Sequence, residues 1–457
     1  MRIDSRSIAA WPLAAGLLLA GCGGTSGGPD RGSAVVTPVQ TAALTTAQID
    51  AGADAMGVAT LLGPARCGVA ISSLEYNTVG GRGEDTNATA AVMVPTGTAD
   101  GCSGERPVVL YAHGTDFDKT FDMAKVDIND EARLTMIAFA AQGYVVVAPN
   151  YTGYARSRLG YHPYLNADAQ ADDMIDAMRA TRAQFGAMST TVKLGKRLYL
   201  SGYSQGGHVA MATQRAMQQR YPDEFTVTAS GPMSGPYALW TFSRLILQGQ
   251  QNIGASLFTP MLVTSYQQAY GNLYTTPSDA YQPPYDTILP DLLPSADPAG
   301  AIAKIPAGAD GSYRTLFDAG DGSPFIFKTS FRLASQQPGS PYAQALQRND
   351  LLGGWKPAAP MALCYGAGDP TVFGMNSTSA EAAFAGQGAT VTRFDVEDAG
   401  TVPAAIQQGF EAAKAGVSAQ AGGGAAGAAA VVAVYHKTLV PPFCLALVRG
   451  FFQGAGG

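Results

Sequence analysis

The chain has 457 residues, of which 46% are hydrophobic and only 14% are charged, and its formal net charge is −6. This apolar content is enough for a large buried core and excludes general disorder. The negative charge and the lack of a basic cluster argue against nucleic acid as the partner.

The first 21 residues are typical of a bacterial lipoprotein signal peptide. After a basic start, an apolar run from Ile8 to Leu19 is too short to span a bilayer. It ends in Leu-Ala-Gly-Cys22, which resembles the lipobox, where the signal is cut before a cysteine that carries lipid. We therefore expect an exported protein, anchored through Cys22 to a bacterial outer membrane or cell surface, with a flexible tether over residues 22–45. An ordinary secretory signal is the alternative, and no later stretch is expected to span a membrane.

Apart from Cys22, the sequence has four cysteines: Cys67, Cys102, Cys364 and Cys444. An even number in an oxidising compartment indicates disulfides, and four cysteines allow three pairings. We favour Cys67 with Cys102, the pair closest in sequence, and Cys364 with Cys444. No Cys or His pair has the spacing of a metal site, so no metal is expected.

From residue 107 onward, short apolar strands alternate with amphipathic helices, which predicts an α/β fold with a mostly parallel sheet flanked by helices. Strands are predicted at 70–78, 87–95, 108–112, 144–148, 197–201, 225–230, 361–365 and 390–396. Helices are predicted at 130–142, 168–185, 205–220 and 442–452. Residues 46–236 and 356–457 would together form this core.

Residues 237–355 interrupt the alternation. Between 237 and 300 only five residues are charged, and aromatic residues are frequent. We expect a helical cap that offers apolar surface to an active site. A helical insertion that merely packs a small core of its own is the plainer alternative.

A second insertion, rich in Ala and Gly, spans 415–430 and is predicted to be a loop or a loosely packed segment. Its Gly422-x-Gly424-x-x-Gly427 spacing matches the dinucleotide-binding fingerprint. No strand precedes this motif and no acidic residue follows at about 20 positions, so no nucleotide cofactor is expected.

The segment Gly202-Tyr203-Ser204-Gln205-Gly206 lies between a predicted strand and a predicted helix. A serine becomes a nucleophile when a base takes its proton and its hydroxyl stands clear of the backbone. A sharp turn from strand to helix achieves this and needs glycines two residues before and after the serine. The helix N-terminus also favours developing negative charge. Ser204 is therefore the predicted nucleophile.

The chain has only four histidines to supply a base. His436 is favoured because it follows the last predicted strand and precedes the closing helix, where this architecture places its base. His208 lies one helical turn beyond Ser204 and is expected to be structural. His162 precedes a proline in a loop, and its role stays open.

The third member of the triad should follow a strand between the nucleophile and the base. Asp369 follows the strand at 361–365 by a short glycine turn and can accept the imidazole N–H. Asp395 and Asp398 are the alternatives. Capping the next helix is the plainer role for Asp369.

His113-Gly114-Thr115 ends the first predicted parallel strand. In this architecture, a backbone N–H of that loop and the N–H of the residue after the serine together hold the oxyanion. Thr115 and Gln205 are the predicted donors, and His113 braces the loop. Gly114 and Asp116 remain alternative donors.

These motifs resemble those of α/β-hydrolases, and more narrowly the secretory lipase/esterase group of fungi and bacteria. The resemblance rests on His113-Gly114, on Pro149–Gly153, on the glycines around Ser204 and on the long insertion. It implies hydrolysis of carboxylic esters, small-molecule or lipid, through an acyl-enzyme without a cofactor, and a pocket wall at Pro149–Gly153. The stretch between 390–396 and His436 is longer than the usual short loop. A peptidase or amidase on the same fold and a ligand-binding surface lipoprotein are the alternatives.

Overall fold

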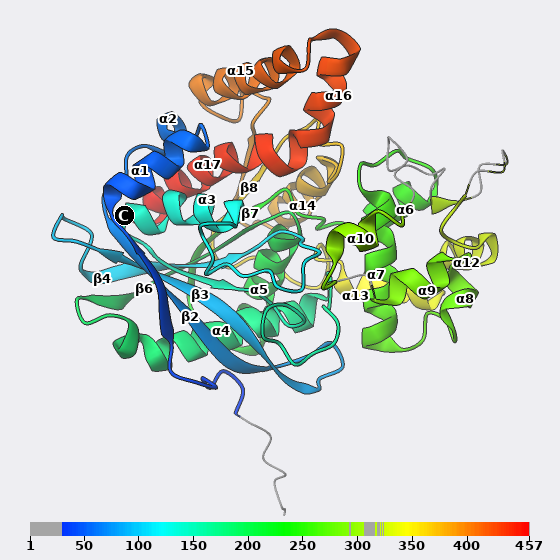
Figure 1. Ribbon diagram of the computed structural model, residues 1–457, viewed down its shortest axis with the longest axis horizontal. Helices are drawn as coiled ribbons and strands as arrows, with labels where there is room; N and C mark the ends of the chain where they lie inside the picture. Colours follow the sequence, from blue (N-terminus) through cyan, green and yellow to red (C-terminus); the bar gives the residue numbers. More distant parts are fainter. Residues whose placement is uncertain are drawn as a thin grey trace, which may run out of the picture.

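The computed structural model describes residues 30–291, 294–305, 316–317, 320, 322 and 324–456. The predicted signal peptide and Cys22 lie outside these residues. Figure 1 shows a central sheet with helices on both faces and a separate group of helices at the right.

The sheet has nine strands in the order β1-β2-β3-β5-β4-β6-β7-β8-β9. Each of the first four in this order is antiparallel to its neighbour: β1 (Val39–Leu44), β2 (Gly68–Val79), β3 (Asp85–Thr96) and β5 (Val145–Pro149). The rest of the sheet runs parallel to β5: β4 (Gly104–Ala112), β6 (Val192–Tyr203), β7 (Val227–Met233), β8 (Met361–Tyr365) and β9 (Val391–Asp395). The predicted mostly parallel sheet is confirmed.

Helices cover both faces of the sheet because alternate residues of its central strands point to opposite sides. Val109 and Tyr111 of β4 belong to one buried cluster, and Val108 and Leu110 to another. The first cluster packs under α1 (Thr46–Ala55), α2 (Ala59–Leu62), α3 (Asp130–Ala138), the short η1 (Ala140–Gln142) and α17 (Val440–Ala455). The second packs under α4 (Ala167–Met188), α5 (Gln205–Arg220) and α14 (Met375–Ala385).

The insertion after β7 is helical and has a hydrophobic cluster of its own, in which aromatic residues predominate. It forms the group of helices at the right of Figure 1. Its described helices are α6 (Leu239–Leu247), α7 (Ala255–Tyr270), α8 (Pro277–Ala280), α9 (Tyr285–Ile288), η2 (Leu289–Asp291), α10 (Pro298–Ile302), α12 (Thr329–Ser335) and α13 (Pro341–Asn349).

The Ala/Gly-rich stretch 415–430 is not a loop, contrary to the prediction. It contributes to two helices, α15 (Ala404–Gln420) and α16 (Gly424–Val434), which lie beside each other at the top of Figure 1. Alanine is the strongest helix former, and glycines at positive φ make the turn between the helices. The expected loose packing holds, because Phe410 and Gly427 are the residues that these two helices bury.

A π-helical turn, η3 (Tyr435–Leu439), joins α16 to α17. Gly424–Ala455 is consequently one helical run that by length and composition alone could cross a membrane, although no such stretch was expected. Of its most apolar window, 44% is buried inside the molecule, and α17 packs on the sheet through residues such as Val440, Cys444 and Val448. These contacts favour a core helix.

Both disulfides join the cysteines that the sequence favoured. Cys67 pairs with Cys102, and Cys364 of β8 pairs with Cys444 of α17, each with a Cα–Cα distance of 5.5 Å. Disulfides persist in oxidising compartments, so they indicate a protein that works outside the cytoplasm.

The tether predicted to reach residue 45 joins the domain earlier than expected. The Arg31 guanidinium lies 3.1 Å from Asp172 and 2.9 Å from Asp176 on α4. Val39–Leu44 then pairs with β2 as the first strand of the sheet. The ion pairs of Arg31 and the hydrogen bonds between β1 and β2 therefore hold the chain against the domain from residue 31 onward.

Candidate active site

Ser204 stands on a sharp turn between β6 and α5. Its φ of 58° and ψ of −120° are a strained conformation for a residue with a side chain, as in the nucleophile turn of hydrolases. A Cβ atom at Gly202 or at Gly206 would overlap the carbonyl oxygen of Ala112 at the end of β4. The glycine spacing therefore lets two strands and a helix meet directly behind the serine.

His436 and Asp369 complete a continuous chain of hydrogen bonds with this serine. The His436 Nε2 atom lies 2.8 Å from Ser204 Oγ, and the Nδ1 atom lies 2.5 Å from Asp369 Oδ2. The other oxygen of Asp369 accepts the backbone N–H groups of Thr371 and Val372, at 2.8 and 3.0 Å. Both carboxylate oxygens thus have defined partners, which fixes the orientation of the imidazole.

The two alternative acids do not take this position. Asp395 accepts the backbone N–H groups of Ala367 and Glu397, each at 3.1 Å. Asp398 accepts the N–H of Gly400 at 2.8 Å. The structure therefore brings Asp369 to His436, while Asp395 and Asp398 shape turns beside it.

The long segment between β9 and His436 contacts the turn that carries Asp369. Lys414 of α15 lies 2.7 Å from one oxygen of Glu397, whose other oxygen accepts the N–H of Gly368 at 2.6 Å. On the far side, the Tyr203 hydroxyl donates to the His436 carbonyl at 2.6 Å. Although burial raises the pKa of Glu397, these bonds from Lys414 and Gly368 leave it below its ordinary value.

The other three histidines are buried, and each has a hydrogen-bond partner at a ring nitrogen. Burial lowers the pKa of His113 and of His208 to about 4, and that of His162 to about 3. His208 contacts the Asn349 carbonyl at 2.8 Å, as expected for a structural residue. His162, whose role the sequence left open, donates from Nδ1 to the Thr152 carbonyl and accepts the side-chain amide of Gln205 at 2.7 Å.

The loop after β4 distinguishes among the candidate oxyanion donors. The Gly114 N–H is taken by Glu131, with its two oxygens at 2.9 and 3.1 Å. The N–H groups of Thr115, Asp116 and Gln205 have no acceptor among the described residues. Gly114 is thereby excluded as a donor, and the predicted pair Thr115 and Gln205 stays available together with Asp116.

His113 holds the same loop from the other side. Its Nδ1 donates to the Gly114 carbonyl at 2.6 Å, and its own carbonyl accepts the Tyr151 hydroxyl at 2.9 Å. The Pro149–Gly153 turn, for which the resemblance implied a pocket wall, is not part of the cavity lining. Tyr151 packs behind the loop instead, stacked on the His113 ring at 4.1 Å.

Sequence reasoning missed Glu131. An acidic residue in the first turn of a helix is usually explained by the helix dipole, so nothing in the sequence singled it out. In the structure its carboxylate also accepts the Tyr111 hydroxyl at 2.9 Å. Burial raises the pKa of Glu131 to about 7 in spite of these bonds.

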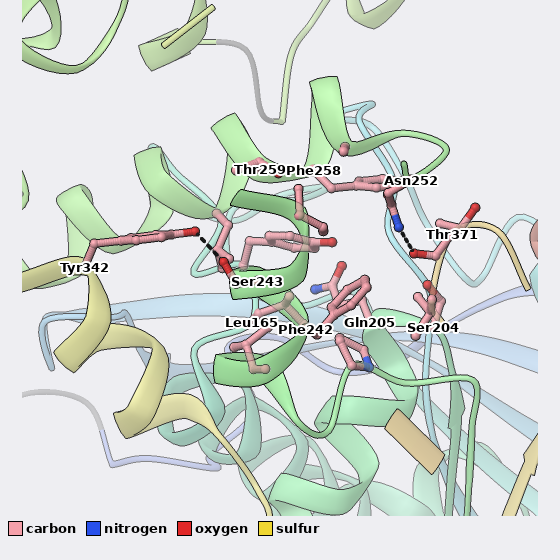
Figure 2. Close-up of a pocket in the computed structure, with 17 residues that line it drawn as sticks. Leu165, Ser204, Gln205, Phe242, Ser243, Asn252, Phe258, Thr259, Tyr342 and Thr371 are labelled. Atoms are coloured by element: carbon pink, nitrogen blue, oxygen red, sulfur yellow. Dashed lines mark hydrogen bonds between the residues drawn. The ribbon is translucent and has the colours of Figure 1, made fainter. Parts of the chain in front are cut away.

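A narrow cavity, partly open to solvent, begins at Ser204. Figure 2 shows Ser204 at one side of it and the Ser243–Tyr342 hydroxyl pair at the other. Apolar side chains from the cap predominate in the wall: Leu239, Phe242, Ile246, Phe258 and Leu262. Within the described part of the chain, no three His, Cys, Asp or Glu side chains are grouped as metal ligands.

Comparison with solved structures identifies the family. The rice cell wall degrading esterase LipA from Xanthomonas oryzae superposes with a TM-score of 0.71 at 30% identity, over 84% of this chain and 97% of that one. The chain belongs to the α/β-hydrolase family of esterases and lipases.

Two further likenesses agree with this assignment. A ligand-bound form of LipA covers 92% of this chain and 98% of its own, at 28% identity and a TM-score of 0.75. Candida antarctica lipase A shares the fold alone, at 13% identity and a TM-score of 0.54, over 80% of this α/β-hydrolase and 76% of its own chain. No protein-family model and no curated protein matches the sequence.

Proposed function

We propose that this α/β-hydrolase is a serine carboxylic ester hydrolase, in which Ser204 is the nucleophile, His436 the base and Asp369 the residue that orients the base. The observation that carries the proposal is the hydrogen-bond chain from Ser204 Oγ through His436 to Asp369, at the entrance of a largely apolar cavity. The strained backbone of Ser204 supports the same role, because a positive φ at a partly exposed serine between a strand and a helix is typical of a nucleophile.

In this mechanism His436 Nε2 takes the Ser204 proton as Oγ attacks the ester carbonyl. Asp369 holds the Nδ1 proton and stabilises the imidazolium that forms. The N–H groups of Gln205 and Thr115 hold the oxyanion, at the helix N-terminus and in the loop after β4. His436 then protonates the leaving alcohol, and water releases the acid from the acyl-enzyme by the same steps.

The lining favours esters whose acyl or alkyl part is apolar, since large aliphatic and aromatic side chains of the cap predominate in it. LipA, its solved relative, is described as a rice cell wall degrading esterase. We further propose that the protein is exported and held at a bacterial membrane by lipid on Cys22. The two disulfides support export.

The first test is labelling of the mature protein with a fluorophosphonate, mapped by mass spectrometry. This probe reacts with an activated serine whatever acyl chain the enzyme prefers. We expect an adduct on Ser204 that is lost in H436A and retained in H208A, the matched histidine variant. An unlabelled but folded protein, still unlabelled after the cap is shortened, would favour a ligand-binding lipoprotein.

Matched ester and amide substrates distinguish an esterase from a peptidase or amidase, which would use the same triad. We expect hydrolysis of the ester and a much slower reaction of the amide with the same acyl group. Faster amide hydrolysis would contradict the proposal. For the lipid anchor, the protein purified from membranes should be heavier than the unmodified chain from Cys22 onward by the mass of the attached lipid. The C22S variant should lack this added mass.

A further inference from the structure

Glu131 of α3 contacts the loop that carries the proposed oxyanion donor. Its Oε1 atom lies 2.9 Å from the Gly114 amide and 2.9 Å from the Tyr111 hydroxyl, and its Oε2 atom lies 3.1 Å from the same amide. The carboxylate therefore holds the backbone of Gly114 with both oxygens, while a buried tyrosine of β4 holds the carboxylate.

Gly114 is the residue of this loop that most needs such contacts. Glycine has no side chain to restrict its backbone, so hydrogen bonds must set its two dihedral angles. Glu131 holds the N–H of Gly114, and His113 Nδ1 holds its carbonyl at 2.6 Å. Both the N–H and the carbonyl of Gly114 are thus held by hydrogen bonds.

The direction of the next amide follows from this arrangement. In a trans peptide the carbonyl of one residue and the N–H of the next point in opposite directions. Because the Gly114 carbonyl points to His113, the Thr115 N–H points away from His113 and has no acceptor among the described residues. A rotation about Gly114 would turn this N–H away from the position it now has.

We propose that Glu131 is a positioning residue: by holding the Gly114 N–H, its carboxylate orients the Thr115 N–H for the oxyanion. The inference rests on the function proposed above, since it assigns a role within the same site. Glu131 is not among the residues that line the cavity. It acts through Gly114 and Thr115.

The carboxylate must be ionised to accept at both oxygens. Protonation would place a hydroxyl proton on one of the two oxygens that now face the Gly114 N–H. The charged and titratable groups that face Glu131 come from several elements: Tyr111 of β4, Asp116 of the loop, Tyr151 after β5, Tyr203 of β6 and Lys437 of η3. Burial raises the pKa of all three tyrosines well above 10, so they stay neutral between pH 5 and 9.

E131Q is the most informative variant, because glutamine has the size of glutamate and the hydrogen-bond pattern of its protonated form. We expect kcat to fall about 10- to 100-fold at pH 9 with little change in KM, somewhat less than the 10²–10³ typical for deleting an oxyanion donor. We also expect the acid limb of log kcat/KM against pH to be steeper in the wild type, in which Glu131 must be ionised, than in E131Q.

A trifluoromethyl ketone reads the oxyanion site directly, because it adds to the serine and leaves a charged oxygen there. Its Ki should rise in E131Q by the same factor by which kcat/KM falls. D130N is the matched control: it changes the acidic neighbour of Glu131 on α3, an exposed side chain that pairs with Arg133 at 3.4 Å. At pH 9 we expect D130N to change kcat and Ki less than threefold.

Two results would overturn the inference. One is an E131Q enzyme with kcat and Ki within threefold of the wild type. The other is the same acid-limb slope in both proteins. Failure of the proposed function looks different: a wild type that neither hydrolyses esters nor labels at Ser204 would remove both proposals together. E131L, which lacks both oxygens, should exceed E131Q in its loss of kcat, and an equal or smaller loss would also count against the inference.

Discussion

Replacing Asp369 by asparagine tests the orientation of the base. The backbone N–H groups of Thr371 and Val372 both point at Asp369 Oδ1, at 2.8 and 3.0 Å. In D369N the amide oxygen must stay at these donors, so the amide NH₂ faces His436 Nδ1. The imidazole then has to accept at Nδ1 and carry its proton on Nε2, where it cannot take the proton of Ser204.

The size of the expected loss in kcat follows from the free energy of the opposite orientation of the side-chain amide in D369N. Turning the amide to restore the correct tautomer would set an NH₂ against two buried N–H groups, at about 1–3 kcal/mol each. A total of about 2–6 kcal/mol corresponds to roughly 30-fold to 2 × 10⁴-fold in rate. The upper end agrees with the loss of about 10⁴ known for this change in serine proteases.

The assay is kcat on a short-chain p-nitrophenyl ester, beside a thermal melt. D369N keeps both backbone hydrogen bonds, so its melting temperature should stay within a few degrees of the wild type. D395N is the matched control, an Asp-to-Asn change at the neighbouring strand end, and should keep kcat within threefold. A D369N enzyme with less than a tenfold loss, or an equal loss in D395N, would refute the reasoning.

Three further predictions follow from the same structure. Replacing Cys364 and Cys444 by serine should lower the free energy of unfolding by about 4–5 kcal/mol, since the bond closes an 80-residue separation, and an unchanged urea midpoint would contradict this. Burial raises the pKa of Glu131 from 4.5 to about 7, so the folded protein loses stability as pH rises between these values. E131Q lacks this titration, and its free energy of unfolding should therefore gain about 1–3 kcal/mol over that of the wild type between pH 5 and pH 8. Parallel curves of stability against pH would count against the shift. F258A removes an aromatic wall of the cavity and should lower kcat/KM about 5- to 30-fold for octanoyl esters while sparing acetyl esters; equal losses would place Phe258 outside the acyl site.

Much of the fold was readable from the sequence because its signals are local. Buried parallel strands have continuous apolar runs, and the helices between them have apolar faces, so the order of elements from 107 to 233 follows from the chain itself. The Ala/Gly-rich stretch 415–430 was misread because low complexity suggested a loop, although alanine favours helix. The strand at 39–44 was missed because it gains its order from pairing with β2.

The sequence by itself determined the turn at Ser204, since glycines at 202 and 206 and the switch from strand to helix are local requirements of an exposed, strained serine. Because the chain has only four histidines, the sequence also indicated His436 as the base. Only the tertiary structure decided which acid meets His436, because Asp369 and Asp395 follow adjacent parallel strands and differ in where their side chains point. It also decided that Gly114 is held by Glu131, a contact between a strand end and a helix that no spacing in the chain encodes. Chemistry that depends on local backbone geometry is written in the sequence, whereas the direction of a hydrogen bond between distant elements exists only once the sheet has formed.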